Sequence, residues 1–404
     1  MAERVQFPLI NFKKSSYIIV EGKEEANGFF IIQRGTVRIF KTVEVVEEEG
    51  SHILGPGKVF GVVSAMSSHH YMESAMAITD VTLLLVTRDQ FTLFVRDNAP
   101  MALEILLQLS QRERFLTESL ARLTLKDASS ADPGHLYTVG EYYVLQGLFE
   151  LAYHTYNRFL KYCPQDARVE QVRERMLQIA PHVHHTGQTF TASDSSRTYP
   201  KETMIFAEGE PGDEMYIIQK GTVKMSKVAN NGEVLLSILK DGAIFGEMAL
   251  LESKPRPACA VAFEESTILP INRANFEQIL SVKPQLITRL VTQMAERIWF
   301  LYKQLDNTQF QDPLARLYNT LLIQLERDQV PMDFPSSHTI DFGLRELTDM
   351  AGFIQGDGSP ALRKLTDNGR IQVLQDKILI ADITEISRRA EYFRKVHRIE
   401  SLKT

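Results

Sequence analysis

The chain has 404 residues, 44% of them hydrophobic and 24% charged, with a formal net charge of −6. This composition is typical of a globular protein with about two to four domains. No apolar run reaches the ~18 residues of a membrane span, no apolar signal-peptide core opens the chain, and Cys163 and Cys259 form neither a disulfide framework nor a metal cluster. We therefore expect a cytoplasmic protein without a membrane partner, which would need a local basic patch to bind nucleic acid.

Residues 1–125 contain short β-branched runs separated by glycine turns, a pattern that predicts a small antiparallel barrel or jelly roll. The run 21–38 repeats the pattern of residues 208–224, and Phe60-Gly61 match Phe245-Gly246. Two copies of one module explain this repeat better than one large sheet. Apolar residues recur at helical spacing after each copy, over 101–123 and over 286–305.

A different pattern separates the two copies, over residues 126–181. Small and aromatic residues recur there at the spacing of a tetratricopeptide repeat: Gly140, Tyr143, Ala152, Tyr156, Phe159 and Pro164. One such repeat cannot bury its faces alone, so we expect this helical linker to pack against a barrel. Binding of a protein partner is the alternative. His182, His184 and His185 follow it, and we interpret them as part of a solvated linker and not as a metal site.

The second copy, over residues 182–312, carries the most specific motif. It reads Phe-Gly-Glu-Met-Ala-Leu-Leu-Glu-Ser-Lys-Pro-Arg-Pro-Ala-Cys over residues 245–259. Gly246 lets the backbone approach a ligand, and a short helix after it turns free N–H groups toward an anion. Arg256 can grip the same anion with a planar fork of donors. Glu247 accepts hydrogen bonds only, which suits a ribose hydroxyl.

This run resembles the phosphate-binding cassette of cyclic-nucleotide-binding domains, with the spacing of protein kinase A regulatory subunits and close to that of bacterial CRP/FNR regulators. Residues 208–223 resemble the glycine-punctuated hairpin of that family. The resemblance implies that Glu247 binds the 2′-hydroxyl and Arg256 the cyclic phosphate. It implies a cyclic nucleotide, with cAMP favoured, as an allosteric ligand and no metal. A cyclic dinucleotide is the alternative, because several relatives have changed ligand.

The implied ligand-binding set lies on the cassette and consists of Gly246, Glu247, Met248, Ala249, Arg256, Pro257 and Ala258. Pro257 lacks the N–H that this position usually gives to the phosphate, so we expect weaker binding than in relatives. Relatives that prefer cGMP often place a hydroxyl residue where this chain has Cys259, and a thiol is a weak donor. The family's long helix caps the base and forms a dimer interface, which implies base-capping roles for Leu301 and Tyr302.

The first copy departs from the family at both ligand-binding positions. Val62 stands at the glutamate position and Tyr71 at the arginine position. Neither side chain can perform the missing role, so we expect a module that has lost ordinary cyclic-nucleotide binding. Because both long helices belong to one chain, they can pair as an intrachain pseudo-dimer or with a second chain.

Residues 313–404 resemble the winged helix-turn-helix of CRP/FNR regulators, on residues 344–352, 361–371 and 378–380. The turns that would read the major groove are replaced by Gln355, Gly356, Asp357, Gly358, Ser359 and Pro360. Glycine and proline disfavour a helix there, so we expect the helix to start late, near Ser359. Gln355, Arg363 and Lys364 remain as candidate DNA contacts. The basic residues of 388–403 offer non-specific contacts or form a solvated helix.

The sequence thus predicts an α+β protein of four parts: 1–125, 126–181, 182–312 and 313–404. Domain order favours a cyclic-nucleotide-responsive transcription regulator, with impaired DNA reading. The alternative is a nucleotide sensor that signals through protein contacts. No catalytic constellation is evident, so we expect that the protein is not an enzyme.

Overall fold

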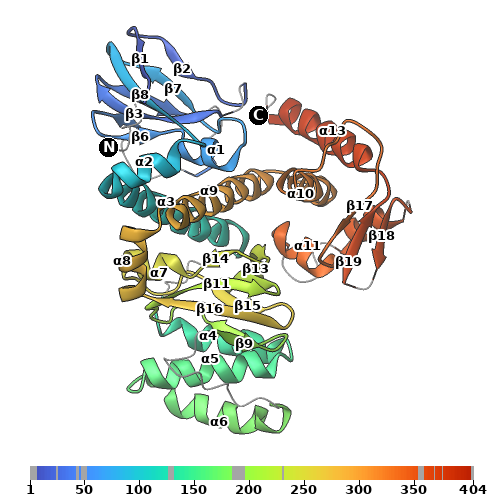
Figure 1. Cartoon of the computed structure of the whole chain (residues 1–404). Coiled ribbons are helices and arrows are strands. Elements are labelled where there is room, and N and C mark those ends of the chain that lie inside the picture. The colour runs from blue at the N-terminus through green and yellow to red at the C-terminus, as the bar shows by residue number, and fades with distance from the viewer. Residues whose placement is uncertain are drawn as a thin grey trace.

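The computed structural model describes residues 7–23, 26–41, 45–46, 52–125, 132–183, 196–229, 232–353, 359–367, 369–374 and 376–401. It shows two antiparallel barrels on either side of a layer of long helices, with a helical unit below the second barrel and a smaller α/β unit beside it (Figure 1). Within the described ranges, every helix is too short or too polar to span a lipid bilayer.

The first barrel consists of two four-stranded antiparallel sheets, with strand orders β1-β8-β3-β6 and β2-β7-β4-β5. Its strands are β1 (Leu9–Phe12), β2 (Tyr17–Ile19), β3 (Gly28–Arg34), β4 (Val37–Phe40), β5 (Ile53–Leu54), β6 (Val59–Phe60), β7 (Ser74–Ala77) and β8 (Val81–Thr87). Its helices are α1 (Val62–Ser67), α2 (Phe91–Asp97) and α3 (Ala99–Leu125). Alternating residues of β8, such as Val81 and Leu83, are buried between the sheets, as the period of a half-buried strand requires.

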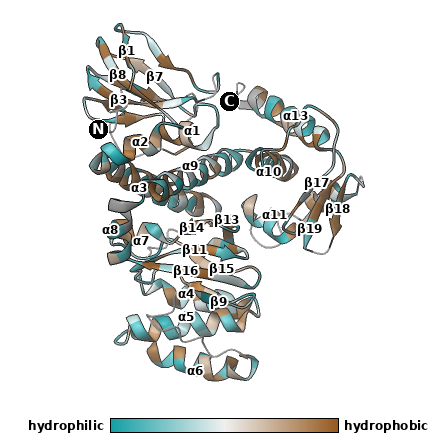
Figure 2. Ribbon diagram, in the orientation of Figure 1, coloured by the Kyte–Doolittle hydropathy of each residue, from teal (hydrophilic) through white to brown (hydrophobic). Residues whose placement is uncertain are grey.

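The second barrel repeats this plan, with strand orders β10-β15-β12-β13 and β14-β11-β16-β9. Its strands are β9 (Arg197–Tyr199), β10 (Met204–Phe206), β11 (Glu214–Lys220), β12 (Val223–Ala229), β13 (Gly232–Leu239), β14 (Ile244–Phe245), β15 (Cys259–Ala262) and β16 (Ser266–Asn272). Its helices are α7 (Glu247–Glu252), α8 (Arg273–Val282) and α9 (Pro284–Asn307). Hydrophobic residues are distributed along the strands of both barrels (Figure 2), and many of them form the cores. The predicted pair of antiparallel barrels is confirmed.

The two long helices α3 and α9 pack against each other between the barrels (Figure 1). Each also contacts the opposite module, because α1 of the first barrel packs on α9 and α7 of the second packs on α3. Trp299 on α9 stacks on His69 at a ring distance of 3.7 Å. Of the two pairings left open by the sequence, the intrachain pseudo-dimer is the one this structure shows.

The helical unit packs against the second barrel, as predicted for the linker. It consists of α4 (His135–Leu145), α5 (Phe149–Tyr162), α6 (Val169–Ile179) and the short 3₁₀ helix η1 (Ala180–His182). A Cβ on Gly140 would lie 2.4 Å from the Tyr156 ring, so glycine is needed for α4 and α5 to approach. His135 places its Nε2 3.0 Å from the Val228 carbonyl oxygen of β12.

The C-terminal unit has a three-stranded sheet of order β17-β19-β18 flanked by helices. Its elements are α10 (Pro313–Arg327), β17 (His338–Ile340), α11 (Leu344–Met350), α12 (Ser359–Thr366), β18 (Ile371–Leu374), β19 (Lys377–Ile380) and α13 (Ile383–Ser401). Asp312 caps α10, because its side chain accepts a hydrogen bond from the Leu314 N–H. Pro313, at the first helical position, has no N–H that requires an acceptor. The described part of α12 begins at Ser359, and because residues 354–358 lie outside the described ranges, the late start of this helix stays a prediction.

Candidate functional site

The predicted cassette folds around a cavity of about 50 Å³ inside the second barrel. Gly246 has φ +77° and lies between the end of β14 at Phe245 and the start of α7 at Glu247. Only glycine adopts this left-handed conformation without strain. Of the predicted ligand-binding set, all but Ala249 line the cavity, and Ala249 is buried beside it on α7.

Arg256 lies inside this site with only 2% of its surface exposed. Its Nη1 donates to the Gly246 carbonyl oxygen at 2.6 Å and its Nη2 to that of Glu214 at 2.7 Å. The guanidinium carbon also lies 4.3 Å from the centre of the Phe206 ring. These acceptors are neutral backbone carbonyls, so neither hydrogen bond pairs the guanidinium with a negative charge. A buried cation of this kind is suited to an anionic ligand.

Glu247 is 1% exposed and already has a cationic partner. Its carboxylate accepts a hydrogen bond from Arg297 of α9, and Arg297 Nε also lies 2.8 Å from Glu113 Oε1 of α3. Burial raises the pKa of Glu113 to about 7, Arg297 opposes this shift, and the charge of Glu247 adds to it. Arg297 of α9 therefore holds the Glu247 carboxylate of the cassette and the Glu113 carboxylate of α3 at once.

The first module's helix forms part of the second module's site. Glu113 and Thr117 of α3 line the cavity, together with Leu301 of α9. Arg114 Nε lies 2.8 Å from the Glu252 carboxylate at the end of α7, and both side chains are buried. These α3 residues were not predicted from the sequence. Their signal is weak, because they are polar positions on an otherwise apolar helix face.

The structure places the two predicted base-capping residues, Leu301 and Tyr302, differently. Leu301 lines the cavity, but Tyr302 is not among the lining residues. Its hydroxyl oxygen accepts a hydrogen bond from Arg112 Nε at 2.8 Å, and Lys41 Nζ lies 3.6 Å from the ring centre. Consecutive helical residues point in different directions. Leu301 therefore faces the cavity, whereas Tyr302 faces the first barrel and α3.

The corresponding site of the first barrel lacks the cassette's charges. Tyr71 occupies the arginine position, is 5% exposed, and donates its hydroxyl to the Gly28 carbonyl oxygen at 2.5 Å. Its ring lies 3.1 Å from where a Cβ on Gly61 would be. Val62 is buried at the glutamate position. A cavity of about 530 Å³ remains between this cassette and α3, lined mainly by apolar side chains.

The candidate DNA contacts lie on the C-terminal unit, which is docked onto the rest of the chain. Arg363 and Lys364 are exposed on α12, whereas Gln355 falls outside the described residues. Gly352, in the turn after α11, faces the end of α3: a Cβ there would lie 2.7 Å from Thr124 Cγ2. Lys240 of the second barrel pairs with Asp341 at 2.8 Å.

No cluster of three or more potential metal ligands occurs in the part of the chain that the structure describes. His182 ends η1, and His184 and His185 lie outside the described residues.

Two segments of the chain, residues 9–98 and 196–283, match the family model of the cyclic nucleotide-binding domain. Each barrel therefore matches the same family model, so the predicted duplication of one module is confirmed. The match does not extend to residues 126–181 or 313–404, whose tetratricopeptide-like and winged-helix interpretations stay predictions.

Individual relatives cover between about half and about two thirds of the chain. The chain is 28% identical, over 193 residues, to a CRP-like cAMP-activated global transcriptional regulator of Mycobacterium tuberculosis. The aligned region covers 48% of this chain and 86% of that relative. Among solved structures, the c-di-GMP responsive global regulator CLP of Xanthomonas campestris is 21% identical, with a TM-score of 0.40 over 46% of this chain and 92% of its own. The regulatory domain of Toxoplasma gondii PKA, solved with cAMP, is 17% identical, with a TM-score of 0.21 over 70% of this chain and 84% of its own.

Proposed function

We propose that this protein is a cyclic-nucleotide sensor and not an enzyme, and that its second barrel binds a cyclic mononucleotide, with cAMP favoured. The observation that carries the proposal is Arg256, a buried cation in the cassette whose hydrogen bonds end on backbone carbonyls. A cyclic phosphate would supply the charge that those carbonyls lack. Glu247, at the other side of the cavity, would accept from the ribose 2′-hydroxyl.

Ligand binding requires this site to open. A cavity of about 50 Å³ is far smaller than the several hundred Å³ typical of small-molecule pockets. The nucleotide must therefore displace Arg256 from its carbonyl partners and move α3 or α9, whose Thr117 and Leu301 line the same space. Because α3 also contacts the turn at Gly352, we propose that this movement reaches the C-terminal unit.

Isothermal titration with a panel of cyclic mononucleotides and cyclic dinucleotides tests the proposal. We expect cAMP to bind more tightly than cGMP. Cys259, which replaces the hydroxyl residue of cGMP-selective relatives, is fully buried, and its sulfur accepts the Glu208 N–H at 3.2 Å. It is therefore not available to a guanine base. Much tighter binding of cGMP or of a cyclic dinucleotide would contradict the proposed selectivity.

The C-terminal unit has two candidate outputs. Its resemblance to a winged helix-turn-helix supports regulation of transcription through DNA. Its docking supports the second candidate, signalling through protein contacts, because the turn at Gly352 is packed on Thr124 and α11 lies against β13. In this arrangement the turn that follows α11 lies next to the protein's own α3.

We expect the full-length protein to bind DNA weakly and without sequence preference, with or without cAMP. Base-specific reading needs ordered side chains in the major groove, and phosphate contacts alone lose affinity steeply with salt. Mobility-shift titrations with genomic fragments at increasing salt would measure this. A defined footprint that survives physiological salt would restore the transcription-factor output and overturn this expectation.

A further inference from the structure

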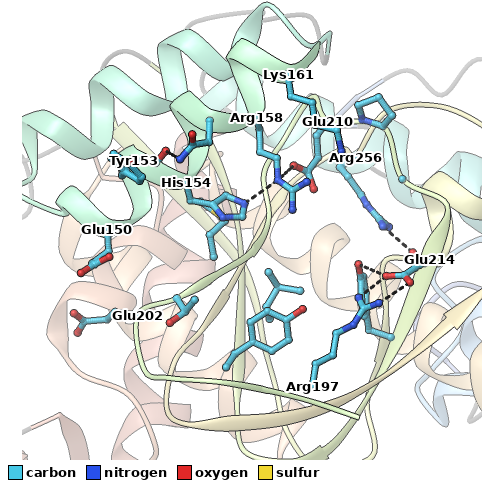
Figure 3. A pocket seen from close by; sticks show the side chains of 18 of the residues that line it. Glu150, Tyr153, His154, Arg158, Lys161, Arg197, Glu202, Glu210, Glu214 and Arg256 are labelled. Carbon is cyan, nitrogen blue, oxygen red and sulfur yellow. Dashed lines mark hydrogen bonds and ion pairs between the residues drawn. The ribbon is translucent and has the colours of Figure 1, made fainter. Parts of the chain in front are cut away.

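A cleft of about 1030 Å³ separates α5 of the helical unit from the second barrel (Figure 3). The α5 wall contributes Tyr153, His154, Arg158 and Lys161. The barrel wall contributes β9, β10, the loop 210–214 and Arg256. This cleft is distinct from the cassette cavity, because it lies on the α5 side of the barrel and includes none of the residues of α3, α7 or α9 that line the cavity.

Positive charge is concentrated at one end of the cleft. Figure 3 shows Arg158, Lys161 and Arg256 gathered near Glu210. Arg158 Nε lies 3.4 Å from Glu210 Oε2, and the charges of all three cations act on the Glu210 carboxylate. Burial nevertheless raises the pKa of Glu210 to about 6. Three cations therefore share a single carboxylate that is itself only 5% exposed.

The cleft lining also includes Lys201 and Asp213, and over the whole lining basic and acidic side chains are equal in number, so the positive excess is local to the end beside Glu210. Arg197 and Glu214 neutralise each other through two hydrogen bonds of 2.6 and 2.9 Å. His154 adds no charge at neutral pH, because burial and the charge of Arg158 lower its pKa to about 3. Glu150 and Glu202 lie at the opposite end of the cleft in Figure 3.

Arg256 connects the cleft to the cassette. It lines both spaces, and its Nε is buried with no hydrogen-bond partner among the described residues. The side chain lies so close to Gly212 that a Cβ there would be 2.3 Å from the guanidinium carbon. Buried donors are nearly always paired in folded proteins, so an unpaired one beside a cleft indicates a ligand atom.

We propose that this cleft is a second ligand site, which binds a small organic phosphate through Arg158, Lys161 and Arg256. Two guanidinium groups and an ammonium group offer the several charged donors that a phosphate accepts. The same phosphate competes with a cyclic nucleotide for Arg256, so the two ligands oppose each other. The competition rests on the proposed function of the cassette, whereas phosphate binding does not.

Titration of the full-length protein with inorganic phosphate, in the absence of nucleotide, tests the site directly. The double variant R158Q/K161Q should bind phosphate at least about tenfold more weakly than the wild type, because two charged contacts are lost. The control R173Q/K220Q removes the same charge from exposed residues outside the cleft and should bind phosphate like the wild type. No measurable phosphate binding to the wild type, or equal affinity in both double variants, would overturn the proposal.

A second titration separates this site from the cassette. Phosphate at saturating concentration should weaken cAMP binding to the wild type several-fold, but not to R158Q/K161Q. The affinity of R158Q/K161Q for cAMP alone should stay within about twofold of the wild type, since neither residue lines the cassette cavity. If phosphate competes equally with cAMP in both proteins, it binds at the cassette itself and the second site is refuted. If phosphate binds as predicted but cAMP does not, the cassette's proposed function fails and the cleft remains.

Discussion

Replacing Arg256 with alanine should lower the affinity of the protein for cAMP by ~30- to 3000-fold. The substitution removes the charged partner of the cyclic phosphate inside a buried site, and the loss of one member of such a pair costs ~2–5 kcal/mol of binding free energy. Calorimetric titration measures the change directly. The melting temperature of the variant should be measured alongside the titration. The Gly246 and Glu214 carbonyls lose their hydrogen bonds in this variant, so its stability can also change.

Tyr71→Phe in the first barrel is the matched control. It removes the hydroxyl that donates to Gly28 but keeps the ring that packs beside Gly61. Its affinity for cAMP should equal that of the wild type. Comparable losses in the two variants would show that the binding domain has been assigned wrongly.

Replacing Arg297 with methionine should lower the free energy of unfolding by ~3–5 kcal/mol, which is the usual cost of removing one partner from a buried ion pair. Arg297 holds both Glu247 and Glu113, so its loss leaves two carboxylates of the interface without their cation. Urea denaturation followed by the fluorescence of Trp299 reports on this interface, since Trp299 is the chain's one tryptophan and lies on α9.

The destabilisation should depend on pH in a defined direction. The pKa of Glu113 is raised from 4.5 to about 7 in the folded protein, so protonation of this group favours the folded state. Its contribution to stability is greatest below about 4.5 and is lost as the pH rises through about 7. Arg297 lowers the pKa of Glu113, so without Arg297 this carboxyl takes up a proton more readily, and the stability deficit of R297M should shrink as the pH falls.

Two variants complete the test. Arg289→Met removes an exposed arginine from the same helix and should change the free energy of unfolding by less than about 1 kcal/mol. The double variant R297M/E113Q should recover part of the loss, because one of the two uncompensated charges is gone. Equal destabilisation by R289M and R297M would refute the role of this ion pair.

The cassette could be located from the sequence because its signal is local. Gly246, Glu247 and Arg256 lie within one short stretch, and the residue types at those spacings suffice to suggest an anion and a hydroxyl held side by side. The repeat was visible for the same reason, since the two copies share glycine turns and strand patterns. A comparison of the two copies was also enough to predict that the first one lacks the charged residues of the cassette, at Val62 and Tyr71.

Contacts between distant segments depend on the tertiary structure. Glu113 and Thr117 reach the cavity of the other module because α3 crosses α9, and helical periodicity does not say which helix a face will meet. The choice between Leu301 and Tyr302 depended on the rotation of α9 about its axis, which adjacent positions in a sequence do not reveal. The positive end of the α5 cleft joins residues from the helical unit to the cassette arginine, and only the packing of α5 on the second barrel brings their charges together.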